Sequence, residues 1–327
     1  APGIWWLVIV GDGRNDFMRS DLRDWCAPLV LGISSVLAQV VLLRETAASF
    51  QGNELSFGIV LGSWLFWNAL GTLIGGWMFD RLRAGTGTLI VLLASVAWLF
   101  PVSLFLMRAA RYICGLQAGE AAGFSHIIGV SFLVLAPLCI VLGAMFPAAV
   151  RLAELNHQQD QNQAGTRERT AWINRTYILE SVGFIIGGLV FNFALVPYVN
   201  AWTVAGITAG MTLVAAWWVG WFGRHRRILV QGIFLAFSTL VWCGLVWCVA
   251  IGSLEFLTQK LRWHGFNLVR TMESPYGNLA VTRERKQISF YENGLLVATI
   301  PAPSTSEPFF HLPLLLHSDP RRVLVLG

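Results

Sequence analysis

Charged side chains are scarce in this sequence. They make up 13% of its 327 residues, against roughly 25% in typical globular domains. Lysine occurs only at Lys260 and Lys286, and the five cysteines form no C-x-x-C pair, so neither a disulfide framework nor a zinc site is indicated. Hydrophobic residues reach 55%, and the mean hydropathy is +0.61. This composition excludes a disordered chain, a disulfide-rich mini-protein and an ordinary cytosolic enzyme, and it places most of the chain in a bilayer.

The charged residues are unevenly distributed. Residues 253–327 carry 14 of the 41 charged residues, and both lysines lie there. We therefore predict an N-terminal segment at 1–25, a transmembrane domain at 26–252, and the start of a water-soluble part after residue 252. Nucleic-acid binding is not inferred from the net charge of +5, because most of the excess is arginine in short loops between apolar runs.

Seven apolar runs are long enough to cross the hydrocarbon core, which needs about 20 helical residues. The opening run Ile4–Val10 is too short to span. No basic segment precedes it, so we do not expect a signal peptide. The predicted spans are 26–43, 57–79, 88–107, 127–150, 177–197, 201–222 and 228–251.

Arginine is biased towards alternate loops of this arrangement. One set holds Arg14, Arg19, Arg23, Arg81, Arg83, Arg151, Arg167, Arg169, Arg175, Arg224, Arg226 and Arg227. The other set holds only Arg44, Arg108 and Arg111. Because cytoplasmic loops are enriched in basic residues, we expect a multi-pass inner-membrane protein with a cytoplasmic N-terminus. An odd number of spans then places residues from Ser253 onward outside.

Glycines recur at helix-packing spacing. Gly71 and Gly75 form one G-x-x-x-G pair, and Gly183 and Gly187 form another. This spacing favours close helix contacts in lipid more than a substrate path. The segment Gly76–Arg81 resembles the G-x-x-x-D-R loop signature of the major facilitator superfamily.

A few polar residues lie within or beside the spans. They are Arg44, Glu45, Asn53, Glu54 and Glu180. An ionisable group inside a membrane is by default a functional candidate. For Arg44, Glu45 and Glu54, anchoring at the membrane interface is the favoured interpretation. Glu180 lies about one turn inside its predicted span, where it can reach the interface or pair with Arg175.

The last 75 residues are expected to begin with an interfacial helix at 253–265, because leucines recur on one face of it. Strands follow at Phe266–Met272, Asn278–Thr282, Gln287–Tyr291 and Leu295–Ile300, and Asn293-Gly294 is a favoured hairpin dipeptide. Residues 266–317 thus form a small antiparallel subdomain that includes a helix at 304–316. Residues 318–327 begin a buried strand.

Four segments of this part resemble the start of spermidine synthases. They are Glu273–Gly277, Phe290–Gly294, His311–His317 and Pro320–Gly327. Upstream, Gln39–Glu45, Gly52–Leu55, Trp64-Leu65 and Tyr177–Gly183 resemble a membrane-embedded branch that joins a facilitator-like helical domain to a spermidine synthase-like domain. The resemblance covers residues 26–327.

The resemblance implies a mainly α protein. It would have a polytopic helical bundle of about seven spans, a small antiparallel sheet, and the first strand of a methyltransferase-like α/β domain. It implies transfer of an aminopropyl group from decarboxylated S-adenosylmethionine, as a co-substrate, to a polyamine or another amine. No cofactor and no metal are implied. The family's catalytic aspartates follow the glycine-rich loop, so we expect the chain ending at Gly327 to be inactive by itself.

Tyr276, Tyr291, Glu307, His311 and Gly327 are the substrate-binding candidates that the resemblance implies. For the two tyrosines, sheet packing is an equal alternative. The sequence departs from the soluble enzymes: Gly277 and Val297 stand where those enzymes have glutamine. The acceptor therefore remains open, and so does a role limited to nucleoside binding.

Two other interpretations stay open. One is a transport or sensor module with a regulatory soluble domain, and the other is an inactive truncated product. The partners expected are the lipid bilayer and an amine, without nucleic acid. The sequence does not indicate an oligomeric state.

Overall fold

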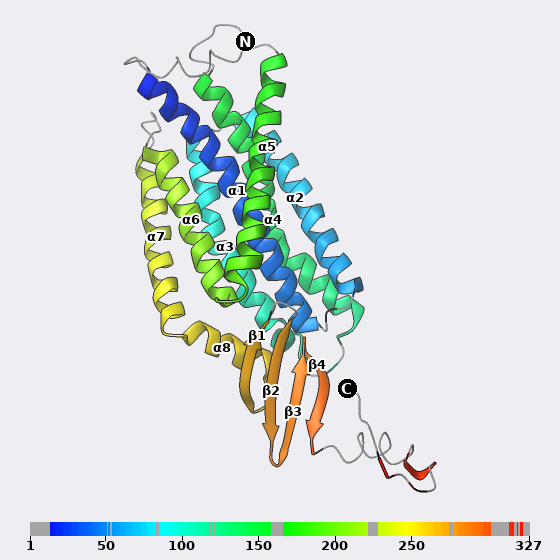
Figure 1. Ribbon diagram of the computed structural model, residues 1–327. Coiled ribbons are helices and arrows are strands. Elements are labelled where there is room, and N and C mark those ends of the chain that lie inside the picture. Colours follow the sequence, from blue (N-terminus) through cyan, green and yellow to red (C-terminus); the bar gives the residue numbers. More distant parts are fainter. Residues whose placement is uncertain are drawn as a thin grey trace.

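The computed structural model describes residues 14–50, 52, 54–82, 85–117, 120, 122–157, 166–221, 228–274, 277–301, 314–316, 319 and 321–322. A bundle of long helices leads into a short helix and a small sheet (Figure 1). The bundle helices are α1 (Arg14–Phe50), α2 (Glu54–Leu82), α3 (Thr86–Ile113), α4 (Phe124–His157), α5 (Thr166–Val190), α6 (Ala201–Trp221) and α7 (Ile228–Ala250).

Within these described residues, seven helices are long and apolar enough to cross a membrane, as predicted. The bounds of all seven spans shift from the predicted ones, and the first and fifth spans shift the most. The first candidate span is Trp25–Phe50 rather than 26–43, so Arg44 and Glu45 lie inside the helix and do not end it. The fifth is Thr170–Leu195 rather than 177–197, and its last turn is a π-helix, Phe191–Leu195. Apolarity alone missed these turns because they contain charged residues, among them Glu45 and Arg175, that contact other parts of the protein.

The bundle is built on two tight helix pairs, α1 with α5 and α2 with α4. A Cβ atom added to Gly183 would lie 2.4 Å from the Leu29 carbonyl oxygen, and one added to Gly71 would lie 2.3 Å from that of Ile140. Only glycine permits such a close backbone approach. This confirms the helix-packing interpretation of the G-x-x-x-G pairs.

The buried apolar core lies mainly among α1, α3, α4 and α6. In contrast, α2, α5 and α7 expose large apolar side chains over much of their length, including Leu65, Ile185 and Leu240. In water such a surface is unfavourable, but in hydrocarbon it is not. The outer helices are therefore suited to contact with lipid.

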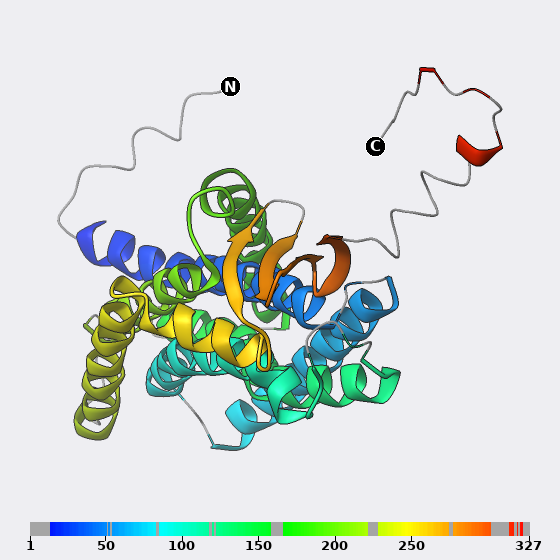
Figure 2. The same cartoon turned by 90° about the horizontal axis from the view of Figure 1, so that it is seen from below.

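After α7, the chain turns at Gly252, whose φ is +70°, into α8 (Ser253–Arg262). A helix was expected at 253–265, and it ends at Arg262; its interfacial position stays a prediction. Its orientation is informative, because Thr258, Gln259 and Arg262 are buried while Phe256 is 73% exposed. The polar face of α8 thus packs on the bundle. Seen from below, α8 and the sheet lie across one end of the bundle (Figure 2).

The sheet has the strand order β1-β2-β3-β4, with every neighbouring pair antiparallel. The strands are β1 (Leu268–Glu273), β2 (Asn278–Glu284), β3 (Gln287–Glu292) and β4 (Leu295–Ile300). They confirm the four predicted strands. Asn293 and Gly294 have φ values of +48° and +78°, as a type I′ hairpin requires. The sheet and the N-terminal end of α1 lie at opposite ends of the bundle (Figure 1).

Candidate functional site

A buried network of charges lies where α1, α3 and α8 meet below the bundle. Its centre is Arg108, close to the C-terminal end of α3, whose side chain is completely buried. Arg108 donates hydrogen bonds to Glu45 Oε1 over 2.6 Å, to Glu255 Oε2 over 2.7 Å and to Thr258 Oγ1 over 3.2 Å. One guanidinium therefore joins two carboxylates from helices far apart in the sequence.

Glu45 carries a second arginine. Arg262, in the last turn of α8, forms an ion pair with Glu45 Oε2, and both side chains are buried. The indole Nε1 of Trp202, at the start of α6, donates to Thr258 Oγ1 over 3.2 Å. The network thus holds α8 against three bundle helices, α1, α3 and α6.

Burying a charge costs desolvation free energy, and the attraction between paired charges offsets only part of that cost. Here Nε of Arg108 and both Nε and Nη1 of Arg262 have no hydrogen-bond partner among the described residues. A hydrophobic contact would hold α8 at lower cost. We infer that the network fixes α8 in one position, because any shift of α8 would leave the buried Glu45 carboxylate without its ion-pair partners.

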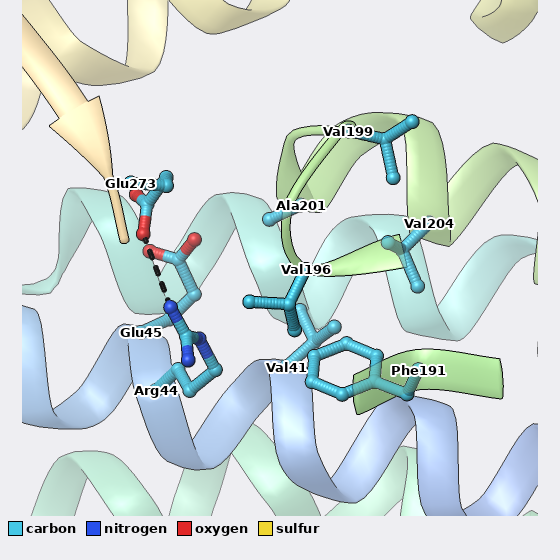
Figure 3. A pocket seen from close by; sticks show the side chains of 9 residues that line it. All are labelled: Val41, Arg44, Glu45, Phe191, Val196, Val199, Ala201, Val204 and Glu273. Carbon is cyan, nitrogen blue, oxygen red and sulfur yellow. Dashed lines mark ion pairs between the residues drawn. The ribbon is translucent and has the colours of Figure 1, made fainter. Parts of the chain in front are cut away.

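A second ion pair joins α1 to the sheet. Nη2 of Arg44 lies 3.8 Å from Oε2 of Glu273, the last residue of β1 (Figure 3). The same guanidinium donates to the Ser274 carbonyl, and the amide of Asn278 donates to Glu273 Oε1 over 2.8 Å. These contacts place the start of the resemblance segment Glu273–Gly277 against the membrane domain.

Burial raises the pKa of the Glu273 carboxyl above its ordinary value of 4.5, and the nearby Glu45 carboxylate raises it further. The guanidiniums of Arg262 and Arg108 lower this pKa by less, as does the hydrogen bond from Asn278. The side chain is 27% exposed, so water still reaches it. Glu273 is therefore a carboxyl group poised to take up a proton at the junction.

The cavity beside this pair is small. Its walls include Phe191, Val196 and Val204 (Figure 3), and its volume is about 30 Å³. That volume has room for about two water molecules. The junction holds the two parts of the protein together, and it cannot enclose an amine substrate.

A much larger cavity, about 520 Å³, lies between the two tight helix pairs. Small-molecule sites usually occupy about 300–1,000 Å³, so this cavity can hold an organic ligand. Its polar lining residues are Ser35, Gln39, Asn68, Thr72, Tyr177 and Glu180. Sequence reasoning named Glu180 among its candidates but did not connect it with the others, because they come from three helices.

The membrane candidates have different surroundings. Glu54 is exposed in the first turn of α2, where interfacial anchoring remains a prediction. Arg44 contacts the sheet. For Glu45, anchoring at the interface is wrong, because the side chain is 4% exposed and paired with two arginines. Glu180 is wrongly placed by the prediction, since it lies ten residues after the start of its span at Thr170.

The expected partner of Glu180 is also corrected. The guanidinium of Arg175 lies over the rings of Trp25 and Trp172, at 5.1 Å and 5.3 Å from their centroids. Glu180 itself has no hydrogen bond or ion pair with any residue that the structure describes. It is the main chain of Glu180 that packs closely, against Gly32 of α1.

Of the substrate-binding candidates, Tyr291 is described. It is 5% exposed and packs against Trp263 and Phe266, with ring centroids 4.9 Å and 6.2 Å away. Tyr291 therefore packs against the aromatic residues next to the sheet, and its role as a ligand contact stays a prediction. The other substrate-binding candidates, Tyr276, Glu307, His311 and Gly327, lie outside the described residues, and so does the membrane candidate Asn53. Most of the predicted helix at 304–316 and of the strand at 318–327 lies outside them as well.

Sequence reasoning missed the three partners of the network: Arg108, Glu255 and Arg262. Arg108 was counted as a loop charge, although it lies five residues before the end of α3. The only hint in the sequence is that Glu45 and Arg108 follow the first and third apolar runs, whose ends lie on the same side of the membrane in the predicted arrangement. In the described part of the chain, no three His, Cys, Asp or Glu side chains gather as a metal site would require.

Comparison with known proteins gives one distant relative. The chain is 23% identical over 308 residues to a polyamine aminopropyltransferase of Leptospira interrogans serogroup Icterohaemorrhagiae serovar copenhageni. The match covers 91% of this chain, and the chain spans about half, 56%, of that protein. No protein-family model matches the chain, and no solved structure matches it. These findings support a spermidine synthase-like relationship and give no support to the facilitator-like resemblance.

Proposed function

We propose that this chain belongs to a membrane-anchored aminopropyltransferase, whose full-length form uses decarboxylated S-adenosylmethionine and an amine acceptor. The observation that carries the proposal is the similarity over 91% of the chain, a share too large to be confined to the helical bundle or to the part that follows it. The buried network and the Arg44–Glu273 pair support it, because they would hold a soluble catalytic domain in one position at the membrane surface.

The proposed reaction is a nucleophilic substitution. The lone pair of a neutral amine attacks the propyl carbon next to the sulfonium, the carbon–sulfur bond breaks, and methylthioadenosine leaves as a neutral thioether. The new ammonium group then loses a proton to water. The protein must orient the two substrates and keep the amine deprotonated. The substrate-binding candidates Tyr276, Glu307 and His311 remain predictions for this role.

The test is an assay of the full-length protein in detergent or nanodiscs. Decarboxylated S-adenosylmethionine is supplied with a series of mono- and diamines, and mass spectrometry measures methylthioadenosine and the aminopropylated product. We expect both products in equal amounts with at least one amine, and neither from residues 1–327 alone. The protein is produced in a host that lacks its own aminopropyltransferase, so that contaminating host enzyme cannot form the products. If no amine gives either product, the proposal fails.

For the sidedness, we propose a cytoplasmic N-terminus and an external sheet. Three arginines lie on the predicted external side, which is otherwise poor in arginine, and each of them contacts other groups of the protein. Arg44 and Arg108 pair with carboxylates, and Arg111 donates to the Ser49 and Glu120 carbonyls over 2.8 Å each. These arginines have structural roles, so their presence on the external side is weak evidence against the proposed orientation.

Two fusions after Gly265 test this orientation. One carries alkaline phosphatase, which is active only outside, and the other carries a fluorescent protein that matures only in the cytoplasm. An active phosphatase with a dark fluorescent protein is expected. The opposite pair of results would place the sheet inside.

A further inference from the structure

The cavity of about 520 Å³ lies near the middle of the candidate membrane spans. Glu180 is ten residues from the Thr170 end of its candidate span, and Ser35 is ten residues from the Trp25 end of its own. At 1.5 Å per residue, each lies about 15 Å from the nearer end of its span, which is about half of the hydrocarbon thickness of about 30 Å. The polar lining is therefore far from either interface.

Glu180 is the ionisable carboxyl group of this lining, and among the residues that the structure describes no arginine, lysine or histidine lines the cavity with it. Among the described residues it also lacks any hydrogen-bond or ion-pair partner. Carboxylates at membrane depth almost always pair with a cation or line a pathway for one. Because the described lining supplies no cation, the ionised form of Glu180 would be complemented by a positively charged ligand.

The rest of the lining indicates what kind of cation fits. Trp64, Phe146 and Phe184 present aromatic surface, which attracts an ammonium group through its ring face and covers an alkyl chain. The amide groups of Gln39 and Asn68 offer neutral acceptors for the N–H groups of such a cation. A bare metal ion would find one carboxylate and leave most of the volume unfilled, and an anion would be repelled.

We propose that this cavity is a binding site for a small alkylammonium ion, with Glu180 as its counter-ion. The site lies in the membrane domain, on helices α1, α2, α4 and α5, away from the junction with the sheet. The proposal does not depend on aminopropyl transfer. It is the kind of site that a transport or sensor role for the bundle would require.

The binding test uses the purified chain in nanodiscs and butylamine as the probe, measured by calorimetric titration. We expect Glu180→Gln to weaken binding about tenfold or more, because it removes a partly buried charge and keeps the side-chain shape. Glu180→Asp keeps the charge and should retain measurable binding. Glu54→Gln, at an exposed position at the edge of the membrane, is the matched control and should bind like the wild type.

Neutral and anionic probes of the same length complete this test. Butanol and butyrate should not bind measurably, and sodium chloride alone should give no saturable signal. Equal affinity of the wild type and Glu180→Gln would overturn the proposal. So would binding of butanol as tight as that of butylamine, or saturable binding of sodium without binding of butylamine.

A measurement on the wild type alone guards against loss of folding in the variants. Dicyclohexylcarbodiimide modifies carboxyl groups in apolar surroundings, and mass spectrometry locates the modified residue. Butylamine should slow the modification of Glu180 at least about tenfold at a concentration of ten times its Kd, and butanol should not. Modification of Glu180 at an unchanged rate would overturn the proposal even if no variant could be purified.

Discussion

Removing the Glu45 charge tests whether the network under the bundle fixes α8. In Glu45→Gln, Arg108 keeps Glu255 as a partner, but Arg262 loses the ion-pair partner that it has among the described residues. The Arg262 side chain is 2% exposed, so it cannot be rehydrated without moving α8. Breaking a buried pair in this way costs about 3–5 kcal/mol. We expect a decrease of that size in the free energy of unfolding.

The assay is reversible unfolding in mixed detergent micelles, followed by tryptophan fluorescence, together with hydrogen exchange of the α8 amides. Exchange should accelerate in α8 and remain unchanged in α2. The control is Glu54→Gln, which should change the free energy of unfolding by less than about 0.5 kcal/mol because Glu54 is exposed.

A double variant makes this prediction sharper. Arg262→Met removes the cation that Glu45→Gln leaves unpaired, so the two substitutions together should destabilise the protein by less than the sum of their separate effects. Additive effects would refute the reasoning, because they would mean that the two side chains contribute independently. A decrease of less than about 1 kcal/mol for Glu45→Gln alone would refute it too, since such a value is typical of exposed pairs.

Three further predictions concern the junction and the helix contacts. Because the pKa of Glu273 is raised, its protonated form stabilises the fold below pH 4.5, and this contribution is lost as the pH rises through the raised pKa. Glu273→Gln should therefore flatten the stability–pH profile in that window, and a parallel profile would contradict this. Gly32→Ala should destabilise the protein by about 1–3 kcal/mol in the unfolding assay, since its Cβ atom would lie 2.1 Å from the Glu180 carbonyl oxygen; Gly58→Ala, which has open space around it, is the control. Gly294→Ala should cost about 1 kcal/mol, because φ is +78° there and a Cβ atom would lie 3.0 Å from a carbonyl of α1; an unchanged midpoint would contradict it.

The spans and the sheet could be predicted because each depends on local signals. Apolar length marks a membrane helix, and alternation with Asn293-Gly294 marks a hairpin. The ends of the spans could not be predicted in the same way. The first turns of α5 contain charged residues, and one of them, Arg175, is held in the helix by the aromatic rings of Trp25 and Trp172. That contact joins two helices that are distant in the sequence, so hydropathy does not record it.

The network was out of reach for a related reason. Glu45 is separated from Arg108 by 63 residues and from Arg262 by 217. Nothing in either segment identifies the other as a partner. The sequence showed only that these charges lie near the ends of apolar runs, where an interfacial position is the common outcome. These charges are buried because α8 packs with its polar face against the bundle, and that packing depends on tertiary contacts.

Two carboxylates of the bundle, Glu45 and Glu180, have different surroundings, and the difference leads to a last prediction. Glu45 meets two arginines, and Glu180 meets no cation within the described part of the bundle. Neutralising Glu45 leaves a buried cation unpaired, whereas neutralising Glu180 removes a charge that is costly at membrane depth. Glu180→Gln should therefore leave the free energy of unfolding unchanged or raise it, while Glu45→Gln lowers it.

Ligand binding should show the reverse pattern. Glu45→Gln should keep the affinity for butylamine under conditions where the protein remains folded, and Glu180→Gln should lose it. Unfolding and titration of the same two preparations give both comparisons. If both variants lost stability equally, Glu180 would be a structural residue with a partner inside the protein. The cavity would then have no unpaired charge to offer a ligand.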